Sequence, residues 1–139
     1  MAAVARTIKP SLATKLPSGA NRIGPKKSGA VLKPGPVYID ANDLVQPSNG
    51  VALNAAAKVH GWVLEDYPNV GAAVTMYVDI DMSWGPSTLT PGSLLYLGTT
   101  AQELDTATTT GGTVACAQVV ENVTMQGTPH SIIRVLTVR

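Results

Sequence analysis

The amino-acid sequence predicts an all-β fold: a compact, jelly-roll-like antiparallel β-sandwich or barrel of about eight short strands, with an extended N-terminal arm. Hydrophobic residues make up 45% of the chain and charged residues only 14%, so Thr, Ser, Asn and Gly must supply the polar surface. The 13 glycines and 10 prolines, together with abundant Val and Thr, favour short strands joined by tight turns. From residue 37 onward, apolar residues alternate with a period of two or form short runs, which is typical of strands. A chain of 139 residues provides one domain with one modest core.

Residues 1–36 are predicted to form the arm, because they combine positive charge with no pattern that builds a core. They hold seven basic residues and no acidic one, whereas residues 37–139 hold three basic and nine acidic residues, a net charge of −6. Pro10 and Pro17 interrupt any helix in the arm, and further Gly and Pro residues follow. A charge asymmetry of this kind usually marks an interaction tail. The chain therefore divides into a basic arm, 1–36, and a β body, 37–139.

The strands of the body are expected where the apolar pattern is continuous and turn residues bound it. These segments are Val37–Asp40, Leu44–Gln46, Gly50–Asn54, Gly61–Glu65, Ala73–Ile80, Ser93–Leu97, Thr113–Glu121 and Ser131–Val138. Thr90-Pro-Gly-Ser93 predicts a type II turn, since Pro and Gly occupy its two central positions. A helical turn is expected only within Ala52–Val59.

A search for catalytic, metal-binding and cofactor-binding residues identifies no site. Cys116 is the single cysteine and lies in an apolar run, which predicts a buried, inert thiol rather than a disulfide or a zinc ligand. His60 and His130 lack metal-ligating neighbours at suitable spacing, and both are expected in turns or on the surface. Asp79 and Asp81 would share one face of a strand, but their surroundings favour a solvated face over a metal site. The sequence thus predicts no enzyme and no cofactor.

An acidic protein surface is the partner that best fits the arm. Its basic residues are dispersed among Pro and Gly, it has no aromatic residue to stack on bases, and the acidic body would repel a polyanion, so nucleic acid is not expected. The residues expected to bind the partner are Val4, Arg6, Ile8, Lys9, Leu12, Lys15, Leu16, Arg22, Ile23, Lys26, Lys27 and Lys33. The apolar members would anchor a strand added to a neighbouring sheet, and the basic members would orient it. Deleting residues 1–34 is accordingly expected to abolish binding and to leave a folded body.

No membrane association is expected, since the chain contains no apolar run of 18 residues. The first six residues are too short an apolar stretch for a secretory signal. Synthesis in the cytoplasm is the resulting expectation.

A series of short motifs between residues 35 and 138 resembles one protein family. The motifs are Gly35-Pro-Val-Tyr-Ile-Asp40, Val45-Gln-Pro-Ser48, His60-Gly-Trp-Val-Leu-Glu65, Leu89-Thr-Pro-Gly-Ser-Leu-Leu-Tyr-Leu-Gly98, Leu104-Asp-Thr106, Ala117-Gln-Val-Val120 and a final Ile-Arg-Val strand. In this order they are similar to the small head-decoration, or cement, proteins of tailed double-stranded DNA bacteriophages. The long basic arm departs from the commoner family pattern, as does Glu121-Asn-Val, where a glycine often stands.

The resemblance implies a structural virion protein, made in the bacterial host cytoplasm and bound to the outer surface of an assembled capsid. Such a protein bridges neighbouring major capsid subunits and stabilises the shell against the pressure of packed DNA. Self-association as a homodimer or a homotrimer is expected, and the sequence leaves both open. Two alternatives remain: another virion part, such as a head-fibre base or tail component, and a small β-barrel hydrolase or carbohydrate-binding module. The second would use Asp79, Asp81 or Trp84, with Trp84 exposed in a loop.

Overall fold

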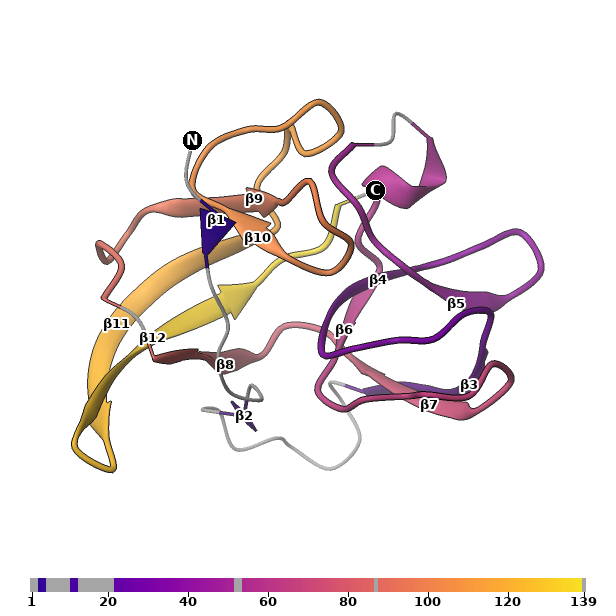
Figure 1. Ribbon diagram of the computed structural model, residues 1–139, viewed down its shortest axis with the longest axis horizontal. Helices are drawn as coiled ribbons and strands as arrows, with labels where there is room; N and C mark the ends of the chain where they lie inside the picture. Colours follow the sequence, from indigo (N-terminus) through magenta and orange to yellow (C-terminus); the bar gives the residue numbers. More distant parts are fainter. Residues whose placement is uncertain (1–2, 5–10, 13–21, 52–53, 87, 139) are drawn as a thin grey trace.

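The computed structural model describes residues 3–4, 11–12, 22–51, 54–86 and 88–138. The predicted all-β fold is confirmed: a closed five-stranded barrel lies beside a curled seven-stranded sheet (Figure 1). The barrel strands are β3 (Arg22–Ser28), β4 (Gly35–Ile39), β5 (Leu44–Pro47), β6 (Gly61–Val63) and β7 (Ala73–Tyr77). The sheet strands are β1 (Ala3–Val4), β2 (Ser11–Leu12), β8 (Asp81–Pro86), β9 (Leu94–Leu97), β10 (Leu104–Asp105), β11 (Ala117–Met125) and β12 (Thr128–Val135).

The order of strands in space is β3-β5-β4-β6-β7 around the barrel and β1-β10-β9-β11-β12-β8-β2 across the sheet. Neighbouring strands run antiparallel, except for the parallel pair β3 and β5. The helical turn expected within Ala52–Val59 is confirmed as η1 (Ala55–Ala57), and the side-chain oxygen of its N-cap residue Asn54 accepts a hydrogen bond from the backbone N–H of Ala56. In the part of the chain that the structure describes, no helix has the length and apolarity needed to cross a membrane.

Seven of the eight expected segments contain a strand, and the expected turn at Thr90–Ser93 is present with Gly92 at φ 88°. The strand expected at Gly50–Asn54 is wrong, because Gly50 and Val51 lie in a turn. The Gly50 N–H donates to the carbonyl of Gly98, and a Cβ at residue 50 would come within 2.4 Å of the Leu97 carbonyl oxygen. Glycine at position 50 therefore allows the backbone of this turn to approach the sheet closely, and the turn forms no strand of its own.

Residues 22–36 belong to the barrel in the structure, although their composition assigned them to the arm. β3 lies between β5 and β7 and so closes the barrel. Its pairing with β7 shifts register between Ile23 and Lys26, and this bulge accommodates Gly24 and Pro25. Gly24 has a φ of 124°, and a Cβ there would lie 2.7 Å from the Val74 carbonyl oxygen, so the position requires glycine. Gly and Pro thus shape a strand here instead of ending one.

The buried apolar residues form two clusters. One fills the barrel and comprises Leu32, Val37, Val45, Val63, Val74 and Met76. The larger one lies against the seven-stranded sheet and includes Trp62, although β6 is a barrel strand. The rings of Trp62 and Trp84 meet edge to face, with centroids 5.8 Å apart, and the Trp62 indole donates to the carbonyl of Leu136. The barrel and the sheet therefore share a core.

The expected exposure of Trp84 is wrong, since only 1% of this residue is accessible. It lies in β8, a strand that the sequence pattern did not predict, since a loop was expected around Trp84. Alternation along β8 places Met82 and Trp84 on the same face, and both join the sheet's core cluster. β7 and β8 are divided by Asp79, whose positive φ of 53° turns the chain between them.

Candidate partner-binding surface

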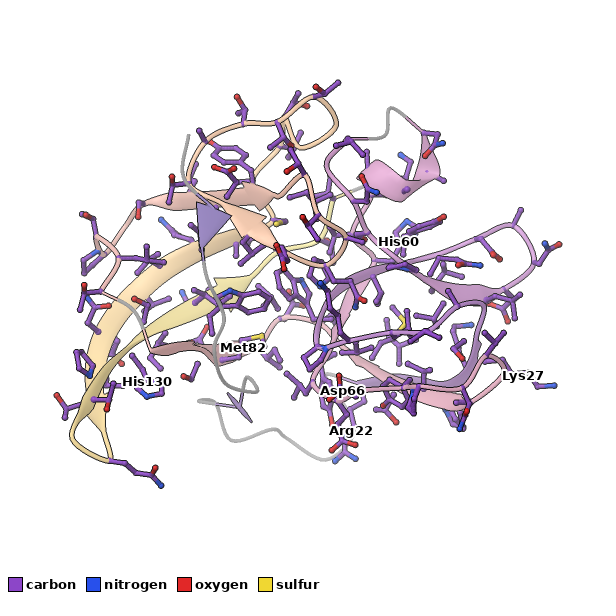
Figure 2. The ribbon with its side chains drawn as sticks, viewed as in Figure 1. Arg22, Lys27, His60, Asp66, Met82 and His130 are labelled. Atoms are coloured by element: carbon purple, nitrogen blue, oxygen red, sulfur yellow. The ribbon has the colours of Figure 1, made fainter. Side chains whose placement is uncertain are left out.

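The cations of residues 22–33 fall into two groups, those that pair with an acidic residue and those that form no ion pair within the described residues. Lys26 Nζ lies 2.6 Å from Asp43 Oδ1, and Lys33 Nζ, beyond the end of β3, lies 3.4 Å from Glu103 Oε1. Arg22 and Lys27 are exposed and form no ion pair with any residue that the structure describes. Figure 2 shows them at opposite ends of β3, pointing away from the barrel. Two of the seven arm cations therefore pair with the protein's own acidic body, and two others are available to a partner.

A hollow of about 490 Å³ adjoins the exposed end of β3. It is lined by Pro25, Lys26, Lys27, Asn42, Asp43, Leu44, Gly71 and Ala73. The lining includes Lys26, Lys27 and Asp43, and Lys26 forms an ion pair with Asp43, so the lining as a whole carries a net positive charge. It is a site that the sequence pattern did not identify, because its walls come from three separate segments.

The β4–β5 hairpin forms one wall of this hollow, and Asp40 holds its shape. Its carboxylate accepts hydrogen bonds from the Gln46 side chain at 2.9 Å and from the backbone N–H groups of Leu44 at 3.0 Å and Asn42 at 2.8 Å. The hydrogen bond from Gln46, followed by that from Leu44, lowers the pKa of Asp40. The hairpin thus keeps its geometry with Asp40 ionised at neutral pH.

The described part of the arm pairs with both outer edges of the sheet. In β1, Val4 lies opposite Leu104 of β10, and in β2, Leu12 lies opposite Met82 of β8 (Figure 1). Ile23, the remaining described apolar anchor, packs partly buried against the barrel core. The other predicted contact residues, Arg6, Ile8, Lys9, Lys15 and Leu16, lie outside the described residues. The N-terminal segment therefore has the backbone conformation of an added strand at two separate places.

His130 is buried, with 5% of its surface accessible, so its expected place in a surface loop is wrong. It lies in β12, and its Nδ1 is 2.9 Å from the Oγ of Ser83 in β8. The pairing of β8 and β12 shifts register between His130 and Ile132, so the side-chain hydrogen bond joins the strands where the regular ladder is interrupted. Ser83 is also buried, and the pair serves as a structural link between the two strands.

His60 is half-buried at the barrel, where its Nδ1 accepts a hydrogen bond of 2.8 Å from the backbone N–H of Ile39. Asp79 shares a hollow of about 350 Å³ with His60. Asp81 instead lies within β8, where Arg134 Nε donates to Oδ1 at 2.9 Å. The hydrogen bond and the charge of Asp81 raise the pKa of Arg134. The turn at Asp79 thus separates the two carboxylates that the sequence pattern placed on one strand face.

Metal binding has no candidate in the described ranges, where no group of three His, Cys, Asp or Glu residues is placed to hold an ion. The sequence reasoning missed the pairing of Ser83 with His130, since 47 residues separate them and neither lies in a recognisable motif.

Cys116 is fully buried, as predicted, and this burial raises the pKa of its thiol to about 12. We expect a thiol reagent such as 5,5′-dithiobis(2-nitrobenzoate) to leave the native protein unlabelled at pH 8, because the thiolate is the reactive form. In guanidinium chloride the same reagent should label one thiol per chain. Rapid stoichiometric labelling of the native protein, followed by absorbance, would show instead that the segment around Cys116 opens readily.

The described surface thus combines the exposed cations of β3, the hollow beside Lys27 and two sheet edges that pair with β1 and β2 of the same chain. Comparison with protein-family models, curated proteins and solved structures finds no match for this chain.

Proposed function

We propose that this protein is a structural component of a phage virion, which binds the outside of the assembled capsid and cements neighbouring major capsid subunits. The observation that carries the proposal is the pairing of β1 and β2 with the two edges of the sheet. A segment that pairs as a strand with its own sheet has the geometry to extend the sheet of a neighbour. The order of motifs that resembles the decoration proteins supports the same class.

The distribution of charge supports a protein partner with an acidic surface. Arg22 and Lys27 are exposed, and the lining of the hollow beside Lys27 carries a net positive charge. Such charges raise the rate of encounter and set orientation more than they increase affinity. Lys26 and Lys33 contribute less to this role, because Asp43 and Glu103 already pair with them.

The stabilising effect would be additive over the shell. Each copy needs only a modest interface, since the same contact is repeated around the lattice and binding to the folded shell favours that state. This mechanism requires no nucleophile and no metal. It requires a rigid body, and the core shared by the barrel and the sheet supports this part of the proposal.

A head-fibre base or a tail component remains the second candidate, because the same β body and arm would suit either part. The hydrolase or carbohydrate-binding alternative is less well supported. Trp84 is buried and cannot stack on a sugar ring, and Asp81 is held by Arg134.

Co-sedimentation with tailless, assembled shells of the cognate major capsid protein tests the proposal. We expect the full chain to sediment with the shells and a chain lacking residues 1–21 to lose at least about tenfold in affinity. The double variant Arg22→Glu, Lys27→Glu should bind more slowly at low salt, whereas Lys58→Glu, an exposed cation remote from β3, should bind normally. Binding by the shortened chain at full strength would contradict the role of the arm. Failure of the full chain to bind tailless shells would exclude the cement function.

A further inference from the structure

The hairpin of β11 and β12 projects beyond the rest of the sheet as a two-stranded ribbon (Figure 1). Its strands are joined by Gln126 and Gly127, whose φ angles of 50° and 79° are typical of a type I′ turn. A Cβ on Gly127 would meet no atom within 4 Å, and Asn122 and Thr124 in β11 are exposed. The end of the ribbon therefore lies clear of the described body.

The register of the hairpin decides which backbone groups face its outer edges. In an antiparallel pair, hydrogen-bonded and non-hydrogen-bonded residue pairs alternate. The turn closes on a hydrogen-bonded pair, Met125 and Thr128, so Thr124 and Pro129 form a non-hydrogen-bonded pair. Proline fits this position, because no N–H is needed there for a bond to β11. The backbone N–H and C=O groups of Thr124, and those of Asn122 two residues earlier, therefore point away from β12.

The two outer edges of the ribbon are protected to different degrees. On β12, Pro129 presents no N–H at the outward position, which is one way in which proteins blunt an edge strand. On β11, the strand β9 and the turn before it cover the outer edge as far as Val119. Among the residues that the structure describes, none bonds the outward backbone groups of Asn122 or Thr124. β11 therefore keeps an open edge at the end of the ribbon.

Charge and register favour a second copy of this chain at the open edge. Residues 122–129 carry no charge, so the edge attracts neither a basic nor an acidic strand, and two copies do not repel each other there. A two-fold axis through Val123 sets Asn122 of each copy opposite Thr124 of the other. Both pairs are then hydrogen-bonded, because both residues present outward N–H and C=O groups. The same axis sets Glu121 opposite Met125, so the two carboxylates do not face each other.

We propose that two copies of this protein associate through the outer edges of β11, about a two-fold axis at Val123, and join their hairpins into one continuous sheet. A two-stranded hairpin is marginally stable by itself in water, and additional strands stabilise it. Pairing therefore stabilises the projecting ends of both hairpins. The contact does not depend on the capsid, and it selects the dimer from the two states that the sequence leaves open.

Thr124→Pro tests the edge directly, because it removes an outward N–H and leaves the bonds between β11 and β12 in place. Thr124→Val keeps that N–H and is the matched control. We expect sedimentation equilibrium of the unsubstituted protein, up to about 1 mM, to show a reversible dimer. Thr124→Pro should weaken the dimer at least about tenfold, and Thr124→Val should leave it unchanged. Guanidinium unfolding of both variants checks that the body is folded.

Disulfide trapping is a second test, which introduces no proline. Position 123 would face its counterpart in a non-hydrogen-bonded pair, where Cα atoms lie about 4.5 Å apart, within reach of a disulfide. We expect mild oxidation of Val123→Cys to give a dimer linked at this position in non-reducing mass spectrometry. Gln126→Cys, in the exposed turn, is the control for random collision. Its counterpart would lie about 20 Å away along the paired strands, so it should cross-link at least about tenfold less. Cys116 does not interfere, because it is fully buried.

Three results would overturn the proposal: a monomer at every concentration, a Thr124→Pro dimer as tight as the unsubstituted one, or Gln126→Cys linking as readily as Val123→Cys. A protein that is monomeric in solution, but whose binding to capsid shells is lost with Thr124→Pro, would assign the edge to a capsid strand instead. Neither the sedimentation nor the trapping measurement uses a capsid, so their failure is distinguishable from failure of the cement function.

Discussion

Deleting residues 1–34 is expected to unfold the protein, and not to leave a folded body as the sequence alone suggests, whereas deleting residues 1–21 is expected to leave the body folded. The longer deletion removes β3, which separates β5 from β7 in the closed barrel, and Leu32, of which only 1% is accessible. Loss of a buried leucine side chain alone costs about 2–5 kcal/mol, against a typical total stability of about 5–15 kcal/mol. Opening the barrel also leaves the facing edges of β5 and β7 unpaired.

The end of the deleted segment is fastened to the sheet as well. The backbone N–H of Lys33 donates to Gln102 Oε1 at 3.0 Å, and the Gln102 side-chain amide donates to the Lys33 carbonyl. Gln102 is itself buried, so removal of its partner leaves polar atoms unsatisfied. Far-UV circular dichroism and guanidinium unfolding of both shortened chains would measure the difference. A cooperative unfolding transition for the 1–34 deletion would show that β3 is not needed to close the barrel.

This result bears on how the partner-binding role is tested. A chain shortened by 34 residues would lose binding simply because it does not fold. Residues 1–21 are the part whose removal separates binding from folding, since the barrel begins at Arg22.

Trp84→Ala is expected to destabilise the protein by about 3–5 kcal/mol, a large part of its total stability. The indole is buried against Trp62, and the edge-to-face pair joins the sheet to a barrel strand. Replacement leaves a cavity at the point where the two parts of the body share their core. Guanidinium unfolding followed by circular dichroism should show a lower midpoint with a similar slope.

Two further variants place this effect in context. Trp84→Phe keeps an aromatic ring in the cavity and should cost less than Trp84→Ala. Val114→Ala removes methyl groups from a residue that is 57% exposed and should change stability by no more than about 0.5 kcal/mol. If Trp84→Ala costs less than about 1 kcal/mol, the barrel and sheet do not depend on this contact.

The sequence by itself determined the all-β class, most strand positions, the burial of Cys116 and the charge asymmetry between residues 1–36 and 37–139. Each of these follows from local properties: alternation of apolar residues, turn residues between them, and simple counting of charge. The turn at Thr90–Ser93 is of the same kind, because its conformation follows from the preferences of Pro and Gly.

The tertiary structure decided which segments pair and which side chains those pairings bury. The dipeptide Gly24-Pro25 suggests a loop when the sequence is considered alone. In the structure, β3 pairs with β7 on both sides of this dipeptide, and the register shifts there. Trp84 and His130 are buried because β8 lies against β12, a contact between segments more than 40 residues apart. Local pattern specifies the faces of a strand, but its partner, and so its burial, comes from distant parts of the chain. The basic segment 22–36 became part of the barrel for the same reason.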